Sequence, residues 1–303
     1  MVGGSRDPDE ARRNFPGREF VQFEASDADS VARALAGVSS AIYLIHGMKG
    51  SGDYEKSEHE AAALFRSQAD KAGLDRVIYL GGVRPAGEVS KHLRSRLETG
   101  EELRGGRTPV AELQASMVIG HGSDSFRMVR DLAARLPMMI LPRWSESRTE
   151  PVSIRDVAQA IRFSLEMPLP ESAVFPIPGP QVMTAGETIL RTASLLGNRP
   201  VHIKVPVLSP TLSGYWLRFV TRTNFHLASE LIEGLRSDLL APDAGLWKLM
   251  PAYIRQSFNE AAVIALRAEA NEIDTAARQW ERLVHRLCKA GDKSARKLDP
   301  RST

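Results

Sequence analysis

Two side chains that could hold and protonate a ligand, His92 and Arg96, lie four positions apart in the segment SKHLRSRLETG. Four residues make about one helical turn, so the two side chains share a face if the segment is helical. Histidine donates or accepts a proton near neutral pH, whereas arginine, with a pKa above about 12, holds anions and hydroxyl groups but does not relay protons. The pair is therefore better suited to binding a ligand than to acid–base catalysis that needs both residues to transfer protons. The alternative interpretation is a solvated basic surface helix.

The first 120 residues alternate short apolar runs with helical patterns. We expect strands at 18–23, 41–46, 76–80 and within 110–120, and helices at 27–38, 58–72 and 90–104. This alternation predicts right-handed crossovers and a parallel sheet, which binds ligands at the carboxyl ends of its strands. The residues at those ends are Glu24, Ala25, His46, Gly47, Met48, Gly81, Gly82, Gly120, His121 and Gly122.

In the second half of the chain, the alternation of apolar runs and helical patterns is less regular. From about residue 140 proline interrupts the pattern, and we expect helices at 154–166 and 184–196, the second capped by Thr184 with Glu187 three residues on. A long helical pattern then covers 251–288, where packing on the body or on a partner is the default interpretation. Its apolar positions include Ile254, Phe258, Ala261, Ile264 and Leu266.

Composition and charge narrow the classes of function. The 40 basic and 37 acidic residues nearly balance to a net charge of +3, which does not call for a nucleic-acid partner. The single cysteine, Cys288, excludes an internal disulfide and suits a reducing cytoplasm, where we expect this protein. No apolar stretch approaches the roughly 20 residues that span a bilayer, and the opening residues have no signal-peptide pattern. The histidines lack metal-ligand spacing, so we expect no metal site.

Several motifs in one order resemble a known family. They are RDP, AIYLIHGM, RVIYLGGV, SKHLRSRLETGEELR, PMMILPRW, EPVSIRDV, IPGPQVMT, VPVLSPTLSGYW and LIEGLRSDL. Together they resemble the NmrA-like atypical short-chain dehydrogenase/reductases, over the chain as far as about Leu240. The resemblance implies an α/β fold with a Rossmann-like doubly wound parallel sheet. It implies an NAD(P)-binding domain at 1–140 and a small substrate or lid region at 141–240. A helical extension with a basic tail follows at 241–303.

One feature of the family is missing. Its members begin with a strand, a glycine-rich turn and a helix, whereas VGGSRDP resembles the end of their second strand, so Gly3 and Gly4 are not the phosphate loop. That loop carries the pyrophosphate on backbone N–H groups. Because the missing strand would be central, we expect its two neighbours to have unpaired edges. Either the sequence starts late, which we favour, or the sheet closes up and the nucleotide site is damaged.

The resemblance assigns cofactor contacts one position at a time. Arg6 matches the basic residue that faces the adenosine 2′-phosphate, which favours NADP, with NAD as the other possibility. Glu24, followed by Ala25, matches the acidic residue near the adenine. The segment of His46, Gly47 and Met48 would lie beside the ribose and nicotinamide, and so would the Gly81–Gly82 pair. The alternatives are a solvated arginine, a core histidine and ordinary loop glycines.

The resemblance also places the reacting groups. Typical short-chain dehydrogenases use a serine, a tyrosine and a lysine four residues after it; here the tyrosine position is His92, the lysine position is Arg96, and the serine position is Gly81 or Gly82. This favours an NADPH-dependent oxidoreductase acting on an unknown small molecule. One alternative is a non-catalytic NADP-binding redox sensor or assembly factor, and another is a chain that binds no nucleotide. In GHGSDSF we expect Ser123 or Asp124 to cap a helix.

Overall fold

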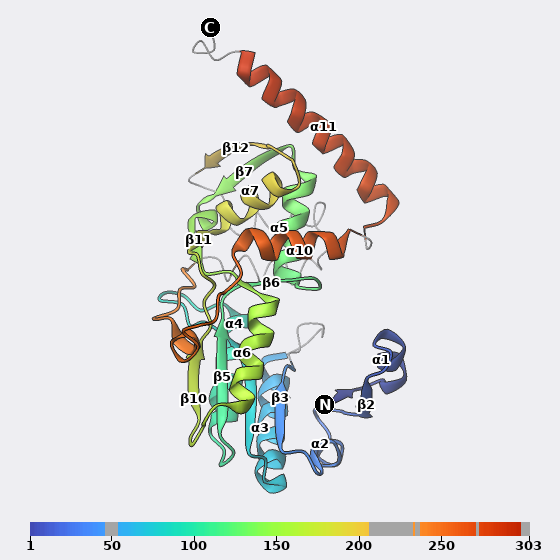
Figure 1. The fold of residues 1–303 in the computed structure, drawn as a ribbon, viewed down its shortest axis with the longest axis vertical. Coiled ribbons are helices and arrows are strands. Elements are labelled where there is room, and N and C mark those ends of the chain that lie inside the picture. The colour runs from blue at the N-terminus through green and yellow to red at the C-terminus, as the bar shows by residue number, and fades with distance from the viewer. Residues whose placement is uncertain (46–53, 206–232, 234–236, 271–272, 298–303) are drawn as a thin grey trace. The chain divides into compact units, whose positions relative to one another are not determined.

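The computed structural model describes residues 1–45, 54–205, 233, 237–270 and 273–297 (Figure 1). The chain forms two compact units. The first unit comprises Met1–Gly82, Lys91–Gln114 and Ala160–Phe175, and the second comprises Val83–Ser90, Ala115–Gln159 and Pro176–Thr303.

A parallel arrangement of strands forms the centre of the first unit. Its four-stranded sheet has the order β10-β5-β4-β3. β3 and β4 run parallel, with Ser40 opposite Arg76 and Tyr43 opposite Tyr79. The bounds of these strands are β3 (Ser40–Tyr43), β4 (Arg76–Gly82), β5 (Val110–Ala115) and β10 (Ala173–Pro176). The proline-rich stretch after residue 140 therefore supplies an edge strand that the sequence pattern did not indicate.

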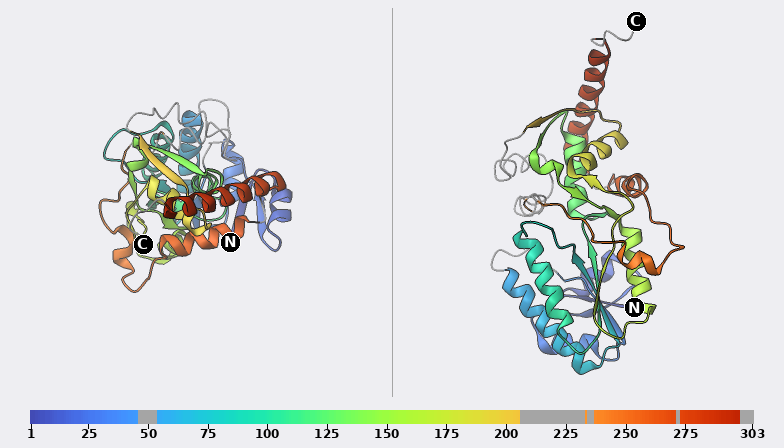
Figure 2. Two further views of the ribbon diagram at one scale, coloured as in Figure 1. Left: turned by 90° about the horizontal axis from the view of Figure 1, so that it is seen from above. Right: turned by 90° about the vertical axis from the view of Figure 1, so that its left-hand side faces the viewer.

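Helices cover both faces of this sheet. Figure 2 shows α3 and α4 side by side on one face, and α6 on the other. The guanidinium of Arg76 in β4 donates to the carbonyls of Ser164 and Met167, which fastens the end of α6 to the sheet. The helices are α1 (Pro8–Asn14), α2 (Ala28–Leu35), α3 (Tyr54–Ala72), α4 (Lys91–Arg104) and α6 (Ile154–Glu166). These bounds lie within a few residues of those expected for α2, α3, α4 and α6.

Local chemistry explains where these helices begin and end. The Asp27 side chain accepts the N–H of Asp29 and starts α2, and Gly37 and Gly73 follow α2 and α3 with φ of +72° and +67°. The core beneath them joins both helices to the strands. It contains Val31, Leu35, Tyr43, Ala62, Phe65, Ala69, Leu74, Val77, Tyr79, Leu103 and Val110.

A separate two-stranded parallel sheet contains β1 (Val2–Ser5) and β2 (Glu19–Gln22). Among the described residues, β1 pairs only with β2, and the outer edge of β3 has no partner strand. These are the unpaired edges that the sequence predicts for the neighbours of a missing strand, and the closed-up sheet is not formed. Apolar side chains near the edges, Val2 and Leu44, are about half exposed. Parallel sheets normally bury both faces, so this exposure is unusual for a parallel sheet.

The second unit combines short strand pairs with helices. Its strand pairs are β6 with β9 (parallel), β7 with β12 (parallel) and β8 with β11 (antiparallel). The strands are β6 (Val118–Ile119), β7 (Met138–Pro142), β8 (Arg148–Thr149), β9 (Val152–Ser153), β11 (Met183–Thr184) and β12 (Val201–Val205). The helices are α5 (Asp124–Arg135), α7 (Ala185–Leu195), α10 (Phe258–Glu269) and α11 (Thr275–Lys297).

Two helix caps in this unit agree with the sequence. The expected Thr184–Glu187 capping box at α7 is present, and the Ser123 side chain caps α5 by accepting the N–H of Phe126. Two core clusters stabilise these helices. One packs α5 against α7 around Val129, Leu132 and Ile189, and the other packs α10 around Phe258.

The single helical pattern expected over 251–288 is wrong. α10 begins at Phe258 because the Ser257–Glu260 capping box starts it there. Before it, Tyr253 Oη and the Gln256 N–H both donate to the buried carboxylate of Asp156, which holds this segment outside a helix. Ile254 lies in that segment with 86% of its surface exposed. The polar partner, and not the apolar spacing, decides the conformation there.

Candidate functional site

The candidate site lies at the carboxyl end of β4, where α4 packs on the sheet. His92 and Arg96 are both half-buried, whereas the neighbouring Arg94 is exposed. The Arg96 guanidinium donates to the carbonyl of Leu80, close to the end of the strand. α4 thus turns Arg96 inward, toward the edge at which parallel sheets bind ligands. The alternative interpretation, in which this segment is a solvated basic surface helix, does not fit the half-buried Arg96.

A buried polar layer fixes α4 in this position. Ser95 Oγ donates to the carboxylate of Glu58 in α3, and Tyr79 Oη donates to the carbonyl of Arg96 at 2.8 Å. Tyr43 meets Tyr79 edge to face, with ring centroids 6.1 Å apart. The helix that carries Arg96 is therefore tied to the sheet through Tyr79 and to α3 through Glu58.

Burial raises the pKa of Tyr79, and burial together with the nearby Tyr79 and Glu58 raises that of Tyr43. Both phenols stay protonated at neutral pH. The Tyr79 hydroxyl already donates to the Arg96 carbonyl, so we assign Tyr79 a positioning role. The sequence analysis missed this layer. The signal was Glu58, which shares the inward face of α3 with the buried residues Ala61, Ala62 and Phe65.

Gly81 and Gly82 are buried at the end of β4. A Cβ on Gly82 would meet Leu93 Cδ1 at 2.5 Å, and one on Gly81 would meet Glu112 Oε1 at 3.0 Å. Both glycines therefore let neighbouring side chains approach the strand. The close approach of Leu93 in α4 explains why residue 82 is a glycine, without a role in binding a ligand. This agrees with the alternative that Gly82 is an ordinary structural glycine.

The adenosine-side candidates lie at the carboxyl ends of β1 and β2. Arg6 directly follows β1, and its side chain is exposed, while the Gln22 amide donates to its carbonyl at 3.0 Å. Glu24 is half-buried and accepts the Ser26 hydroxyl at 3.0 Å, and Ala25 is half-buried beside it. The exposed Arg6 side chain is accessible to a phosphate, whereas the Glu24 carboxylate already accepts a hydrogen bond within its own turn. His46, Gly47 and Met48 lie outside the described residues.

The N-termini of α1 and α2 do not suit a pyrophosphate. Asp7 accepts the Glu10 N–H at 2.8 Å and Asp27 accepts the Asp29 N–H at 3.0 Å, so a carboxylate occupies each helix start. A carboxylate there uses the N–H groups that would bind phosphate and repels its charge. The starts of α1 and α2 therefore do not supply a cradle for a pyrophosphate.

The glycines that precede α1 have a packing role. A Cβ on Gly3 would meet the Phe20 ring at 2.6 Å, and one on Gly4 would meet Phe23 Cβ at 2.9 Å. These contacts explain the pair without a bound phosphate, in agreement with the expectation that Gly3 and Gly4 are not the phosphate loop. Among the residues that the structure describes, no cluster of three or more metal-ligating side chains occurs.

Comparisons with known proteins identify the fold. No protein-family model and no curated protein matches the sequence. Triphenylmethane reductase of Citrobacter sp., solved with NADP(H), has a TM-score of 0.67 and 16% identity over 88% of this chain and 90% of that chain. Quinone oxidoreductase QOR2 of Escherichia coli, solved with NADPH, has a TM-score of 0.65 and 18% identity over 86% and 89%.

A nucleoside-diphosphate-sugar epimerase of Staphylococcus aureus is similar as well, with a TM-score of 0.66 and 14% identity over 87% of this chain and 90% of that chain. These likenesses confirm the expected α/β fold of the Rossmann type. At such identities they show the fold alone, and the site must be argued from its own residues.

Proposed function

We propose that this protein binds NADP(H) at the carboxyl ends of the strands in its first unit and acts as an oxidoreductase of the atypical, NmrA-like short-chain dehydrogenase/reductase type. The observation that carries the proposal is the placement of Arg96, whose guanidinium lies on the Leu80 carbonyl at the end of β4 with His92 one helical turn before it. Similar folds solved with NADP(H) and NADPH support the choice of ligand.

The roles follow from the chemistry of each side chain. Arg96 has further N–H donors besides the one on Leu80, and these hold the hydroxyls of the nicotinamide ribose. Arg6 meets the 2′-phosphate, and Glu24 and Ala25 lie beside the adenine. Gly81 and Gly82, at the end of β4, lie beside the ribose and nicotinamide. A bound dinucleotide would supply the hydride of the reaction, and His92 would donate a proton to the substrate.

A sensor without chemistry is the second candidate, and two observations favour it. Arginine at position 96 cannot relay a proton as lysine can. The buried Tyr79 hydroxyl donates to the Arg96 carbonyl, so this phenol is committed to holding α4. The carboxylates of Asp7 and Asp27 at two helix starts favour the third possibility, a chain that binds no nucleotide or binds it only weakly.

Calorimetric titration with NADPH tests the proposal. Arg96→Ala should weaken binding by roughly 10- to 150-fold, because hydrogen bonds to a charged group contribute about 1.5–3 kcal/mol. The matched control is Arg94→Ala, which removes an exposed arginine from the same helix and should leave the affinity unchanged. Equal losses in both variants, or no binding by the unmodified protein, would reject the proposed site.

Turnover separates the enzyme from the sensor. NADPH oxidation should be followed by the loss of absorbance of the reduced nicotinamide, with a panel of quinones and carbonyl compounds as substrates. Binding of NADPH that depends on Arg96, accompanied by no oxidation with any compound, would leave the sensor as the function.

A further inference from the structure

Helix α11 of the second unit has an apolar stripe that its own unit does not cover. Val284 and Cys288 are buried and face the unit. Trp280, Leu283 and Leu287 are 50%, 43% and 48% exposed. Their spacing of three and four residues places these three side chains along one face of the helix. We call them the α11 stripe.

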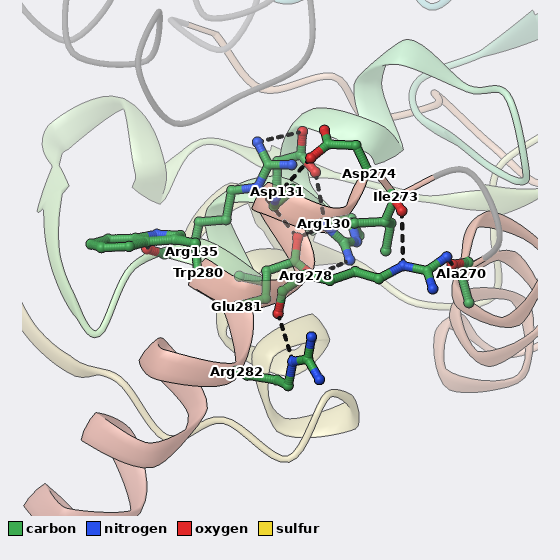
Figure 3. A network of polar contacts seen from close by, with 12 residues as sticks. Arg130, Asp131, Arg135, Ala270, Ile273, Asp274, Arg278, Trp280, Glu281 and Arg282 are labelled. Carbon is green, nitrogen blue, oxygen red and sulfur yellow. Dashed lines mark hydrogen bonds and ion pairs between the residues drawn. The ribbon is translucent and has the colours of Figure 1, made fainter.

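A buried ion network fastens α11 so that the stripe faces outward. The Glu281 carboxylate, next to Trp280, accepts hydrogen bonds from Nη1 and Nη2 of Arg130 and from Nε of Arg135, both in α5 (Figure 3). The Arg130 side chain is 4% exposed. Burial alone would lower the pKa of Arg130, but hydrogen bonds and charge from Glu281 raise it. This helix is therefore held firmly, and the exposure of its stripe is not a result of loose attachment.

Cationic side chains flank the stripe on its solvent side. Arg282, Arg286 and Lys289 are exposed; on the helical wheel Arg286 adjoins Leu283, and Arg282 and Lys289 lie farther round, toward the side opposite the stripe. The only acidic residue in the sequence from Ala276 to Lys289 is Glu281, which the network neutralises. The outward surface of α11 thus combines an apolar stripe that includes tryptophan with a basic flank.

Exposed apolar side chains also occur on two paired strands of the same unit. The Trp280 indole donates to the carbonyl of Arg135 at 3.1 Å, three residues before Met138 at the start of β7. Met138 pairs with Val201 of β12, and both side chains are more than half exposed, as is Ile203. A single exposed apolar side chain needs no explanation, but a group from two elements indicates an interaction surface.

We propose that α11 docks the second unit on an anionic lipid surface, with the helix lying in the plane of the headgroups. A charged polar face rich in arginine and lysine, opposite tryptophan and leucine, is the pattern of an interfacial helix. Among the described residues no helix has the length and apolar character to cross a bilayer, so the contact is peripheral. A second copy of this chain is disfavoured, because pairing two stripes would bring the basic flank of each helix, which begins at Arg286, toward that of the other.

Co-sedimentation with vesicles tests this docking. The full chain should bind vesicles of phosphatidylcholine mixed with phosphatidylglycerol, bind phosphatidylcholine alone much more weakly, and dissociate from the mixed vesicles as salt is added. Leu283→Glu with Leu287→Glu should reduce binding by roughly tenfold or more. Arg282→Gln should reduce it by about fivefold, the effect expected for one basic residue at an anionic membrane.

The matched control is Ile254→Glu with Ile264→Glu, which introduces the same charges at exposed apolar positions of the second unit away from the stripe. This variant should sediment with the mixed vesicles about as well as the unmodified protein, apart from a small general repulsion. Circular dichroism should show that all variants are folded. Failure of the unmodified chain to bind, or equal losses in both double variants, would overturn the proposal.

Analytical ultracentrifugation tests the alternative that a second copy of this chain covers the α11 stripe. A dimer of the unmodified chain that the Leu283→Glu/Leu287→Glu variant abolishes, without vesicle binding, would assign the stripe to a second copy and reject the lipid surface. Because the test uses no nucleotide, its outcome is independent of the proposed NADP(H) binding.

Discussion

Helices α4 and α11 carry similar residues but are attached to their units in different ways. Each helix has a histidine and several arginines in its sequence. In α4 the key guanidinium, that of Arg96, is bonded to a backbone carbonyl at the end of a strand. In α11 the charge that points inward belongs to Glu281, which two buried arginines of α5 neutralise.

The difference shows that the partner decides the role of a charged side chain. A carbonyl uses one donor of a guanidinium and leaves its charge uncompensated, so Arg96 can still attract an anionic or hydroxylated ligand. Two carboxylates, those of Glu281 and the buried Asp131, satisfy the donors and the charge of Arg130, so that arginine serves to attach a helix. Basic helices with the same composition can therefore hold a ligand or hold the fold.

The largest expected effect concerns catalysis at α4. His92→Ala should lower any reductase turnover by about 10²–10⁴-fold while it leaves NADPH affinity nearly unchanged, because a proton donor accelerates the reaction without holding the cofactor. The control is His59→Ala, an exposed histidine of α3. Stopped-flow or steady-state NADPH oxidation measures the rate, and calorimetry measures the affinity. Turnover that survives the loss of His92 would remove this residue from the mechanism.

The corresponding test on α11 concerns stability. Glu281→Ala removes one of the two carboxylates that Arg130 and Arg135 contact, while Asp131 remains beside both. We expect a loss of about 1–3 kcal/mol, the cost of leaving buried hydrogen-bonding groups unsatisfied. Hydrogen exchange should rise in the peptides that contain α5 and α11 and stay unchanged in α3 and α4. Gln279→Ala, at an exposed position of the same helix, is the control. If Glu281→Ala unfolded at the same denaturant concentration as the unmodified protein, α11 would be held by its apolar contacts alone.

A smaller effect distinguishes packing from ligand approach at Gly82. Gly82→Ala should destabilise the first unit by about 1 kcal/mol, the lower end of the range for overpacking, since the end of the Leu93 side chain can shift. The measurements are urea unfolding and NADPH titration on the same variant. A loss of affinity with unchanged stability would show that Gly82 serves a ligand and not the packing of α4.

An effect of comparable size, on nucleotide choice and not on stability, is expected at the exposed Arg6. Arg6→Ala should weaken NADP by roughly tenfold and NAD hardly at all, the lower end of the 1.5–3 kcal/mol expected for a hydrogen bond to a charged group. Arg18→Ala, another exposed arginine of the first unit, is the control. Titration with both nucleotides would contradict this role if Arg6→Ala weakened NAD and NADP equally.

Much of the fold follows from local sequence. The spacing of apolar residues and the capping residues locate α6 at 154–166 and start α7 after Thr184, because these signals depend on neighbours within one or two helical turns. The short strand β10 and the break before α10 were not predictable in this way. β10 is defined by its place beside β5, and the segment before α10 is held by Asp156, 97 positions away in sequence from its partner Tyr253.

The same division applies to the candidate site. The sequence by itself determined that His92 and Arg96 share a helical face, since this follows from helical geometry, and that Arg6 and Glu24 follow strands. Only the tertiary structure decided that Arg96 points to the Leu80 carbonyl, that Tyr79 and Glu58 hold α4, and that aspartates occupy the starts of α1 and α2. The physical reason is that spacing orients a side chain about its own helix, whereas its hydrogen-bond partner depends on which other segment is packed against that face.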